Sequence, residues 1–266
     1  MVMSELALGL QMIVRDEVLA LYDAEMRKDP VPEAESRVEK LGSIVRVIGK
    51  ESYVIFSELN QSTAPTAIAE QRDYFRQAGL EVEWKVFGHD RPENLSELLE
   101  AAGFVPDEPE TLVVFDLQQG FPQADPPAGV EIRRVLDESG VRDAVAANEA
   151  AFAPVHHSSQ HLIEAFQDPS QALFVAYADG VPVSSGRVAM TPGRSFAGLW
   201  GGGTAPAYRH RGIYRNLVWA RADLAHRRGA RYLTVDARET SRPILLQLGF
   251  VPLTTTRAWV LRPDSP

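Results

Sequence analysis

The sequence predicts an α/β (α+β) protein with a mixed, twisted sheet and two similar halves. Three observations predict this class. Short β-branched runs alternate with amphipathic helical segments along most of the chain. In the second half, a glycine-marked strand leads directly into a long amphipathic helix. The string Gly-Phe-Val-Pro occurs at 103–106 and again at 249–252, each time between a predicted helix and a predicted strand.

Composition narrows the class of protein. With 266 residues, the chain is long enough for one large domain or for two domains of about 130 residues each. A hydrophobic content of 45% and a charged content of 24% are typical of a globular protein with ample core material. The formal net charge of −9 argues against a nucleic-acid partner or an anionic membrane, and it allows a cationic substrate such as an amine.

Two absences in the sequence exclude further classes. The chain has no cysteine, which excludes disulfides, thiolate metal sites and a cysteine nucleophile. No apolar run approaches the roughly 18 to 20 residues of a membrane span, and the N-terminus lacks the pattern of a secretory signal. A cytoplasmic location is the default expectation.

In the first half, glycines after helical patterns mark the helix ends at Gly79 and Gly103. The predicted elements are helices within 5–28, a loop over 31–40, strands at 43–48 and 53–58, a turn at 60–65, a helix at 67–78, a strand at 81–87, a helix at 94–102 and a strand at 111–117. The following segment, QQGFPQADPPAG, has the proline and glycine density of an interdomain linker. We therefore expect a first domain over 1–120, a linker over 121–129 and a second domain over 130–266.

The second half repeats the alternation of strands and helices. Its predicted elements are a strand at 130–135, helices at 137–152 and 162–166, a hairpin of 173–178 with 181–190 through Asp179-Gly180, a strand from 196, a long helix, a strand at 231–236, a short helix at 241–248 and a last strand at 255–261. Pro243 fits the first turn of the short helix.

The stretch Phe196–Ala225 organises the second half. Glycines at 201–203 inside the strand indicate a bulge or a ligand that approaches the backbone. Pro206 breaks the strand, and an arginine-rich turn ending at Gly212 leads into the helix. A helix start with free N–H groups and flanking arginines can bind a phosphate or pyrophosphate. The alternative is that Gly212 merely starts a helix and that the arginines are a solvated face.

This stretch resembles the central motif of the GNAT acetyltransferase superfamily, in which a splayed strand precedes a loop of the form Q/R-x-x-G-x-G/A. The loop here runs from Arg209 to Tyr214, and Tyr214 replaces the final small residue, which adds bulk near the phosphates. The resemblance covers 130–261 well and 40–117 weakly. It implies that acetyl-CoA binds as co-substrate. The implied binding residues are Gly202, Gly203, Thr204, Arg209, Arg211, Gly212, Ile213, Tyr214, Arg215 and Ser241.

The internal repeat predicts a tandem pair of GNAT-like domains. The helix, strand, helix, strand order that surrounds 103–106 recurs around 249–252. The first half has no glycine run at 60–65, before its helix, so its domain is predicted to have lost acetyl-CoA binding. Its remaining roles are core support, coverage of the substrate cleft, or a surface for a second subunit, which would make a homodimer.

Catalytic groups are harder to place. Many members of the superfamily carry a glutamate on the central strand and a tyrosine four residues before the glycine of the Gly-Phe pair. Here the strand has Trp200 and glycines but no glutamate, and the residue four before Gly249 is Leu245 rather than a tyrosine. The predicted catalytic residues are Glu149, Tyr208 and Glu239; the other candidates are His156, His157, Tyr214 and Asp236. Each of these residues could instead be a solvated surface residue or cap a turn. We expect no metal site.

The first functional hypothesis is an N-acetyltransferase whose C-terminal domain transfers acetyl from acetyl-CoA to an amine of a small molecule or peptide by direct attack. The missing glutamate and tyrosine motivate a rival, a non-catalytic protein that binds or senses acyl-CoA. A third hypothesis is that the first domain mainly forms an oligomer interface.

Overall fold

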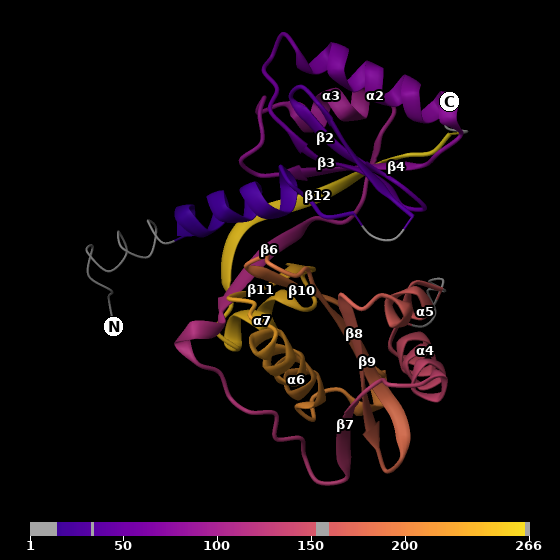
Figure 1. Ribbon diagram of the computed structural model, residues 1–266, viewed down its shortest axis with the longest axis vertical. Helices are drawn as coiled ribbons and strands as arrows, with labels where there is room; N and C mark the ends of the chain where they lie inside the picture. The colour runs from indigo at the N-terminus through magenta and orange to yellow at the C-terminus, as the bar shows by residue number, and fades with distance from the viewer. Residues whose placement is uncertain (1–14, 33–34, 153–159, 264–266) are drawn as a thin grey trace, which may run out of the picture. The chain divides into compact units, whose positions relative to one another are not determined.

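The computed structural model describes residues 15–32, 35–152 and 160–263, and Figure 1 shows its helices and strands. Contacts divide the chain into two compact units. As far as the structure describes them, unit 1 consists of Met1–Val113, Asp236–Pro243 and Val251–Pro266, and unit 2 of Val114–Val235 and Ile244–Phe250.

The sheet of unit 1 has the strand order β1-β2-β3-β4-β12. These strands are β1 (Arg37–Leu41), β2 (Ile44–Ile48), β3 (Ser52–Ser57), β4 (Val82–Phe87) and β12 (Val251–Leu261), with the short β5 (Val105–Pro106) paired to β12. β3 and β4 are parallel, and the other neighbouring pairs are antiparallel. The predicted loop over 31–40 was wrong at its end, because β1 is a strand at the edge of the sheet, paired with β2, and three of its five residues are charged.

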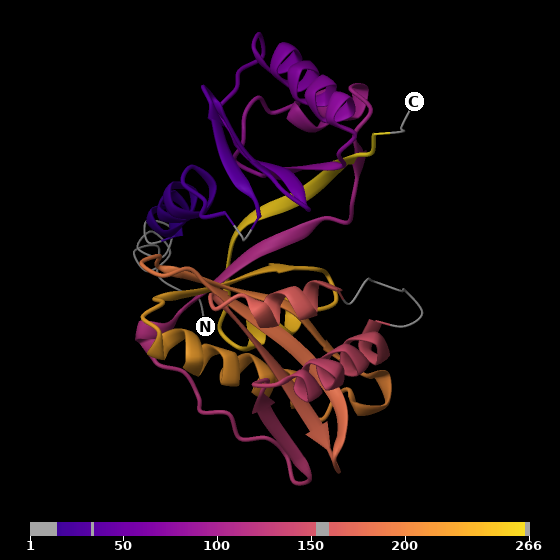
Figure 2. The ribbon, with the colours of Figure 1, turned by 45° about the vertical axis from the view of Figure 1, so that its right-hand side comes forward.

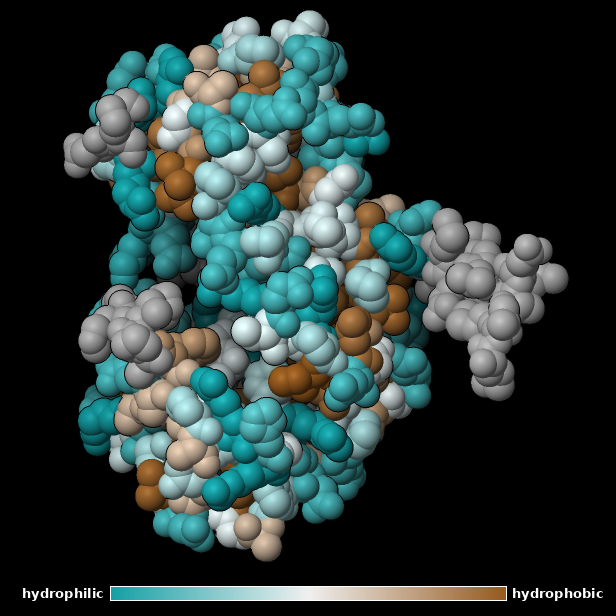
Figure 3. Space-filling view, turned by 180° about the vertical axis from the view of Figure 1, so that it is seen from behind, coloured by the Kyte–Doolittle hydropathy of each residue, from teal (hydrophilic) through white to brown (hydrophobic). Residues whose placement is uncertain are grey.

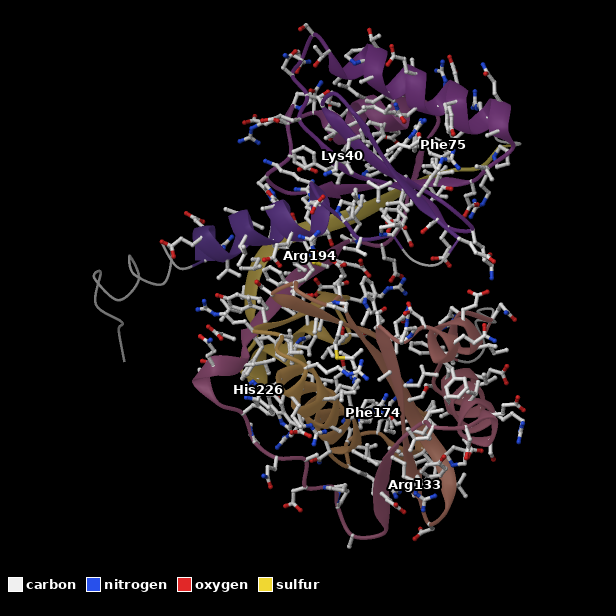
Figure 4. All side chains as sticks on the ribbon, viewed as in Figure 1. Lys40, Phe75, Arg133, Phe174, Arg194 and His226 are labelled. Atoms are coloured by element: carbon white, nitrogen blue, oxygen red, sulfur yellow. The ribbon has the colours of Figure 1, made fainter. Side chains whose placement is uncertain are left out.

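Two helices cover one face of this sheet, α2 (Ala64–Ala78) and α3 (Leu95–Ala101) (Figures 1 and 2). The core beneath them joins Ile68 and Phe75 of α2, Leu99 of α3 and Trp84 of β4, all at most 1% exposed. Figure 4 labels Phe75. Residues 15–22 are helical and continue into η1 (Asp23–Arg27), whose neighbour Tyr22 packs on Phe87.

The sheet of unit 2 runs from the end of β6 (Glu110–Asp116) in the order β6-β11-β10-β9-β8-β7. Its other strands are β7 (Val130–Arg134), β8 (Gln171–Ala178), β9 (Val181–Met190), β10 (Phe196–Thr204) and β11 (Tyr232–Ala237). β10 and β11 are parallel, whereas β7 to β10 are antiparallel neighbours. The hairpin of β8 with β9 confirms the turn predicted at Asp179-Gly180.

Helices cover both faces of the sheet in unit 2. α4 (Glu138–Phe152) and α5 (Gln160–Gln167) pack on Leu173 and Val175 of β8. Ile213 of α6 (Ile213–Arg227) packs on the opposite face, against Ala176 of the same strand. Because successive side chains of a strand point to opposite faces, β8 contributes to both cores. The short η2 (Leu117–Gln119), η3 (Pro206–Tyr208) and α7 (Arg242–Gln247) complete the described elements.

The predicted repeat is confirmed in its element order. α2, β4, α3 and β6 recur as α6, β11, α7 and β12. Gly103 and Gly249 both adopt a left-handed φ, of 93° and 94°, and the phenylalanine after each is buried. The last strand of each repeat, however, extends into the unit formed by the other repeat. β12 pairs with β4 of unit 1, and the end of β6 lies in unit 2, where the Leu117 N–H donates to the Arg231 carbonyl.

The predicted linker lies along α6. Phe121 stacks on Trp219 and contacts the ring of His226, which Figure 4 labels. The N–H of Asp125 donates to Asn216 Oδ1 at 2.7 Å, near the start of the helix. The two units defined by contacts are discontinuous in sequence, because Asp236–Pro243 and Val251–Pro266 belong to unit 1. The division into domains at 1–120 and 130–266 with a linker at 121–129 stays a prediction.

Hydrophilic residues cover most of the face seen in Figure 3, although apolar residues also reach the surface. Within the described residues, none of the helices has an apolar stretch long enough to cross a membrane.

Candidate functional site

The candidate site begins where β10 diverges from β11. The parallel register pairs Phe196–Gly198 with Tyr232–Thr234 and ends there, while β10 continues to Thr204. On its other side β10 stays paired with β9 as far as Thr204. Beyond Gly198, the backbone edge of β10 that faced β11 is therefore released from the ladder, as expected for a splayed strand. Such an edge can pair with an extended ligand.

The glycine run has a separate structural reason at each position. A register shift between Trp200 and Gly203 marks a β-bulge, and Gly201 adopts a φ of +57° within it, which favours glycine. A Cβ on Gly203 would lie 2.8 Å from the Phe152 ring, and a Cβ on Gly202 would lie 3.0 Å from the Tyr214 ring. α4 and α6 thus approach the strand closely from its two faces.

The turn before α6 leaves the helix start without a side-chain cap. His210 and Gly212 have left-handed φ values of 62° and 78°, and Gly212 is the N-cap residue. Asn216 stabilises this turn, because its Nδ2 donates to the Gly212 carbonyl at 3.0 Å. The first N–H groups of a helix have no partner within it, and Gly212 supplies no side chain to accept from them.

The charge around this helix start is positive. Arg211 and Arg215 are exposed on either side of Gly212, and the first turn of α6 contains no acidic residue. A Cβ on Gly212 would have only Asn216 Nδ2 near it, at 4.0 Å, so the outer side of the turn is sterically accessible. The turn, the helix dipole and the two arginines together favour an anionic ligand.

Arg209 makes contacts that sequence reasoning missed. Its Nε donates to the Thr204 carbonyl and its Nη2 to the Ala151 carbonyl, both at 3.0 Å. These bonds tie the end of β10 to the last turn of α4. Ser184 of β9 reinforces the same strand end, since its hydroxyl donates to the Gly203 carbonyl at 2.6 Å.

Two polar side chains of α6 lie beneath the strand. The Tyr214 ring packs under Gly202, and burial raises the pKa of its hydroxyl. Arg221, two turns further on, is 1% exposed, and burial lowers the pKa of its guanidinium to about 10. Sequence reasoning named Tyr214 and missed Arg221. The available signal was its position four residues after Leu217 and four before Ala225, on the apolar stripe.

The structure places two of the three predicted catalytic residues in unit 2. Glu149 is exposed on α4. Tyr208 is half-buried beside Ile213, and the guanidinium of Arg211 lies 5.2 Å from its ring centre. Glu239 and Ser241 belong to unit 1, where Glu239 pairs with Arg242 and the Ser241 hydroxyl donates to the Arg238 carbonyl.

The other candidates are dispersed. Asp236 belongs to unit 1, where it accepts a hydrogen bond from the Thr256 hydroxyl and lies 3.5 Å from Lys85 Nζ. His156 and His157 lie outside the described residues. Groups of three or more His, Asp or Glu side chains arranged to hold a metal ion are not found in the described parts of the chain.

Two residues that were not predicted flank the splayed strand on its α4 face. Trp200 is 43% exposed just before the bulge, and Arg187 lies opposite it on β9. The guanidinium of Arg187 is 5.8 Å from the Trp200 ring centre, and its Nη1 donates to Gln171 Oε1 at 2.7 Å. The signal that could have identified this pair was the single charged residue of β9, whose other residues are uncharged.

Comparison with protein families decides the class of this fold. Residues 142–250, which include β10, the glycine turn and α6, match the model of the acetyltransferase (GNAT) family. This segment is a GNAT domain. The chain is accordingly an acyltransferase by class. Comparison with the curated proteins gave no match.

Solved structures share the fold over nearly the whole chain. A GCN5-related N-acetyltransferase from Kribbella flavida is 16% identical over 93% of each chain, with a TM-score of 0.66. A tandem GNAT protein from the clavulanic acid biosynthesis pathway is 15% identical over 96% of each chain, with a TM-score of 0.61. A GCN5-related N-acetyltransferase from Sphaerobacter thermophilus is 17% identical, with a TM-score of 0.62, and covers 94% of this chain and 86% of that one. At these identities the similarity concerns the fold.

Proposed function

We propose that unit 2 binds acetyl-CoA and transfers its acetyl group to an amine of a small molecule or peptide. One observation carries the proposal. The edge of β10 that is released after Gly198 leads, within one chain segment, to an uncapped and positively charged helix start at Gly212. An extended ligand with a pyrophosphate at one end would use both features.

The residues present fit such a ligand. The N–H groups from Arg211 to Arg215 would bind the pyrophosphate, with the Arg211 and Arg215 guanidinium groups beside it. The backbone of Gly202, Gly203 and Thr204 would pair with the pantetheine arm. The Tyr214 ring packs under Gly202. Arg209 would act by fixing the end of β10, because its guanidinium binds two backbone carbonyls.

The chemistry requires one bond exchange and two proton transfers. The neutral amine attacks the thioester carbonyl, the new N–C bond forms and the C–S bond breaks. A backbone N–H of β10 would stabilise the tetrahedral oxyanion. The amine nitrogen loses a proton, and the departing thiolate gains one. Glu149 and Tyr208 are the candidates for these transfers within unit 2, and Glu239 is a third candidate from unit 1.

The proposal is tested by incubating the protein with acetyl-CoA and a panel of amines and following the release of free thiol. The chain contains no cysteine, so a thiol reagent reports CoA without background from the protein. Release that depends on both protein and amine supports the transferase. Acetyl-CoA binding without release under any amine supports the rival, a non-catalytic acyl-CoA sensor.

Several finer statements belong to the same proposal. The tandem organisation, with an N-terminal GNAT-like domain that does not bind acetyl-CoA, is supported by the repeat and by the similarity to a tandem GNAT protein over 96% of the chain. The cytoplasmic location and the homodimer stay predictions. Gel filtration coupled to light scattering tests the homodimer.

A further inference from the structure

Arg221 is a buried cation, and no carboxylate among the described residues forms an ion pair with it. It is 1% exposed, and its hydrogen bonds go to carbonyl oxygens: Nε donates to Leu217 at 3.0 Å and Nη1 to Arg187 at 3.1 Å. Taking a guanidinium out of water is costly, and carbonyl oxygens offset this cost less well than a carboxylate. The contribution of Arg221 to stability therefore does not explain why it is buried here.

The space around the guanidinium is created by two glycines on neighbouring strands. A Cβ on Gly186 of β9 would lie 2.8 Å from Nη1, and a Cβ on Gly202 of β10 would lie 3.3 Å from Nη2. The Cβ position of Gly186 is also 3.3 Å from the Gly202 Cα, so the two strands meet closely at this point. Arg221 thus fills the space directly beneath the β-bulge.

Arg221 also fixes the strand next to the bulge. The carbonyl that it binds belongs to Arg187, which is the register partner of Trp200, the last paired residue before the shift. On the outer side of the same bulge, Gly201 is exposed and Gly202 half-exposed. The side chain therefore connects α6 to the part of β10 whose backbone edge is released from β11.

We propose that Arg221 is a positioning residue of the acyl-CoA site, which holds the bulge of β10 in its binding geometry and keeps a positive charge beneath it. The inference rests on the proposed function and assigns a new residue to the same site. Gly202 has no side chain that would separate the guanidinium from a ligand lying on the strand.

The test replaces the cation by an apolar side chain of similar length in Arg221→Met. Replacing a buried charge by a hydrophobic residue is often neutral or stabilising when no buried partner charge is left behind. We expect the midpoint of thermal unfolding to stay unchanged or to rise, and the Kd for acetyl-CoA, measured by calorimetry, to increase at least tenfold. Arg221→Lys, which keeps the charge, is expected to recover part of the affinity.

The matched control is Arg227→Met, which removes one positive charge from an exposed position of the same helix, where the side chain is 64% exposed and pairs with Asp223. Its Kd should stay within threefold of the wild-type value. A purely structural role for Arg221 predicts the opposite pattern. An Arg221→Met variant that fails to fold, that melts several degrees lower, or that binds acetyl-CoA as the wild type does would overturn the inference. A wild-type protein that does not bind acetyl-CoA would overturn the proposed function and this inference with it.

Discussion

The two units share one order of elements and differ in the turn before the equivalent helix. Before α2 in unit 1, the Asn60 side chain accepts hydrogen bonds from the N–H groups of Ser62 and Thr63, and Thr63 Oγ1 accepts from the Asn60 N–H. Before α6 in unit 2, Gly212 offers no capping side chain. Neither helix has a side-chain cap at its N-cap residue. The start of α2 still offers fewer free donors, because the Ala64 N–H donates to the Asn60 carbonyl and Pro65 has no N–H.

The strands before these helices differ in the same sense. β3 pairs with β4 only through Ser52–Val54, just as β10 pairs with β11 only through Phe196–Gly198. In unit 1, the fully buried Arg27 bridges the two strand ends, since it donates to the Ile55 carbonyl and stacks 3.8 Å from the Phe87 ring centre. One copy of the splayed pair is thus closed by the chain itself. This difference supports our proposal that unit 2, and not unit 1, binds the ligand.

Each unit contains a buried arginine, Arg27 in unit 1 and Arg221 in unit 2, and the two differ in their partners. Arg27 is held by Asp90 at 2.7 and 2.9 Å and by Asp23 at 2.8 Å, so its charge is paired, whereas Arg221 binds carbonyl oxygens. Arg27→Met is expected to lower the free energy of unfolding by about 3 to 5 kcal/mol, because two carboxylates would lose their partner inside the protein. Urea unfolding of the full chain measures this loss.

Urea unfolding of Arg221→Met provides the comparison, since the free energy of unfolding of that variant is expected to equal or exceed the wild-type value. Equal losses at Arg27 and Arg221 would contradict the distinction between a charge paired with carboxylates and one that binds carbonyl oxygens. Acetyl-CoA affinity of the Arg27→Met variant should stay at the wild-type level at temperatures where the variant is folded.

A smaller effect is expected where α4 meets β10. In Gly203→Ala, the new Cβ would lie 2.8 Å from two Phe152 ring carbons and 2.9 Å from the Ala151 Cβ, so the helix end or the strand must shift. Overpacking of this kind costs about 1 to 3 kcal/mol. The measurement is again urea unfolding. Adding Phe152→Ala should recover part of the loss, because the close approach to the Ala151 Cβ stays, and strict additivity of the two substitutions would show that the ring contact is not a cause.

The smallest effect concerns pH and unit 1. Burial raises the pKa of Glu83, whose neighbours include Lys85 and Asp236. A carboxyl whose pKa is raised on folding adds stability below its unfolded pKa, and this contribution is lost as the pH rises through its folded pKa. Relative to Glu83→Gln, the wild type should therefore become less stable as the pH rises above the usual glutamate pKa of about 4.3.

Urea midpoints of both proteins at pH values below and above this pKa give the difference directly. Glu97→Gln, on the exposed face of α3, is the matched control for the loss of one carboxylate. A wild type that gains stability over Glu83→Gln as the pH rises would show that attraction to Lys85 outweighs the effect of burial.

Patterns of apolar residues and glycines were sufficient to predict most elements. The hairpin of β8 with β9 and the glycine turn before α6 depend on local residue types, so the sequence contains their signal. The strand β1 was missed because three of its five residues are charged, as in a solvated loop. The sequence also could not predict that β12 joins β4, because the last strands of the two repeats begin with the same Gly-Phe-Val-Pro string.

The candidate site shows the same limit. Backbone features such as Gly212 were predictable, since glycine has a specific conformational use there. The roles of Arg27, Arg209 and Arg221 were not, because a long charged side chain looks the same in sequence whether it is solvated or buried. Only packing in three dimensions shows that each binds backbone carbonyls.

The central claim is that one unit binds acyl-CoA and the other does not. The most direct measurement is calorimetric titration of acetyl-CoA into the wild type and into Gly212→Glu, whose added carboxylate would repel the pyrophosphate at the start of α6. The account predicts one site per chain in the wild type and no binding to the folded variant. Two sites per chain, or binding that survives Gly212→Glu, would contradict it.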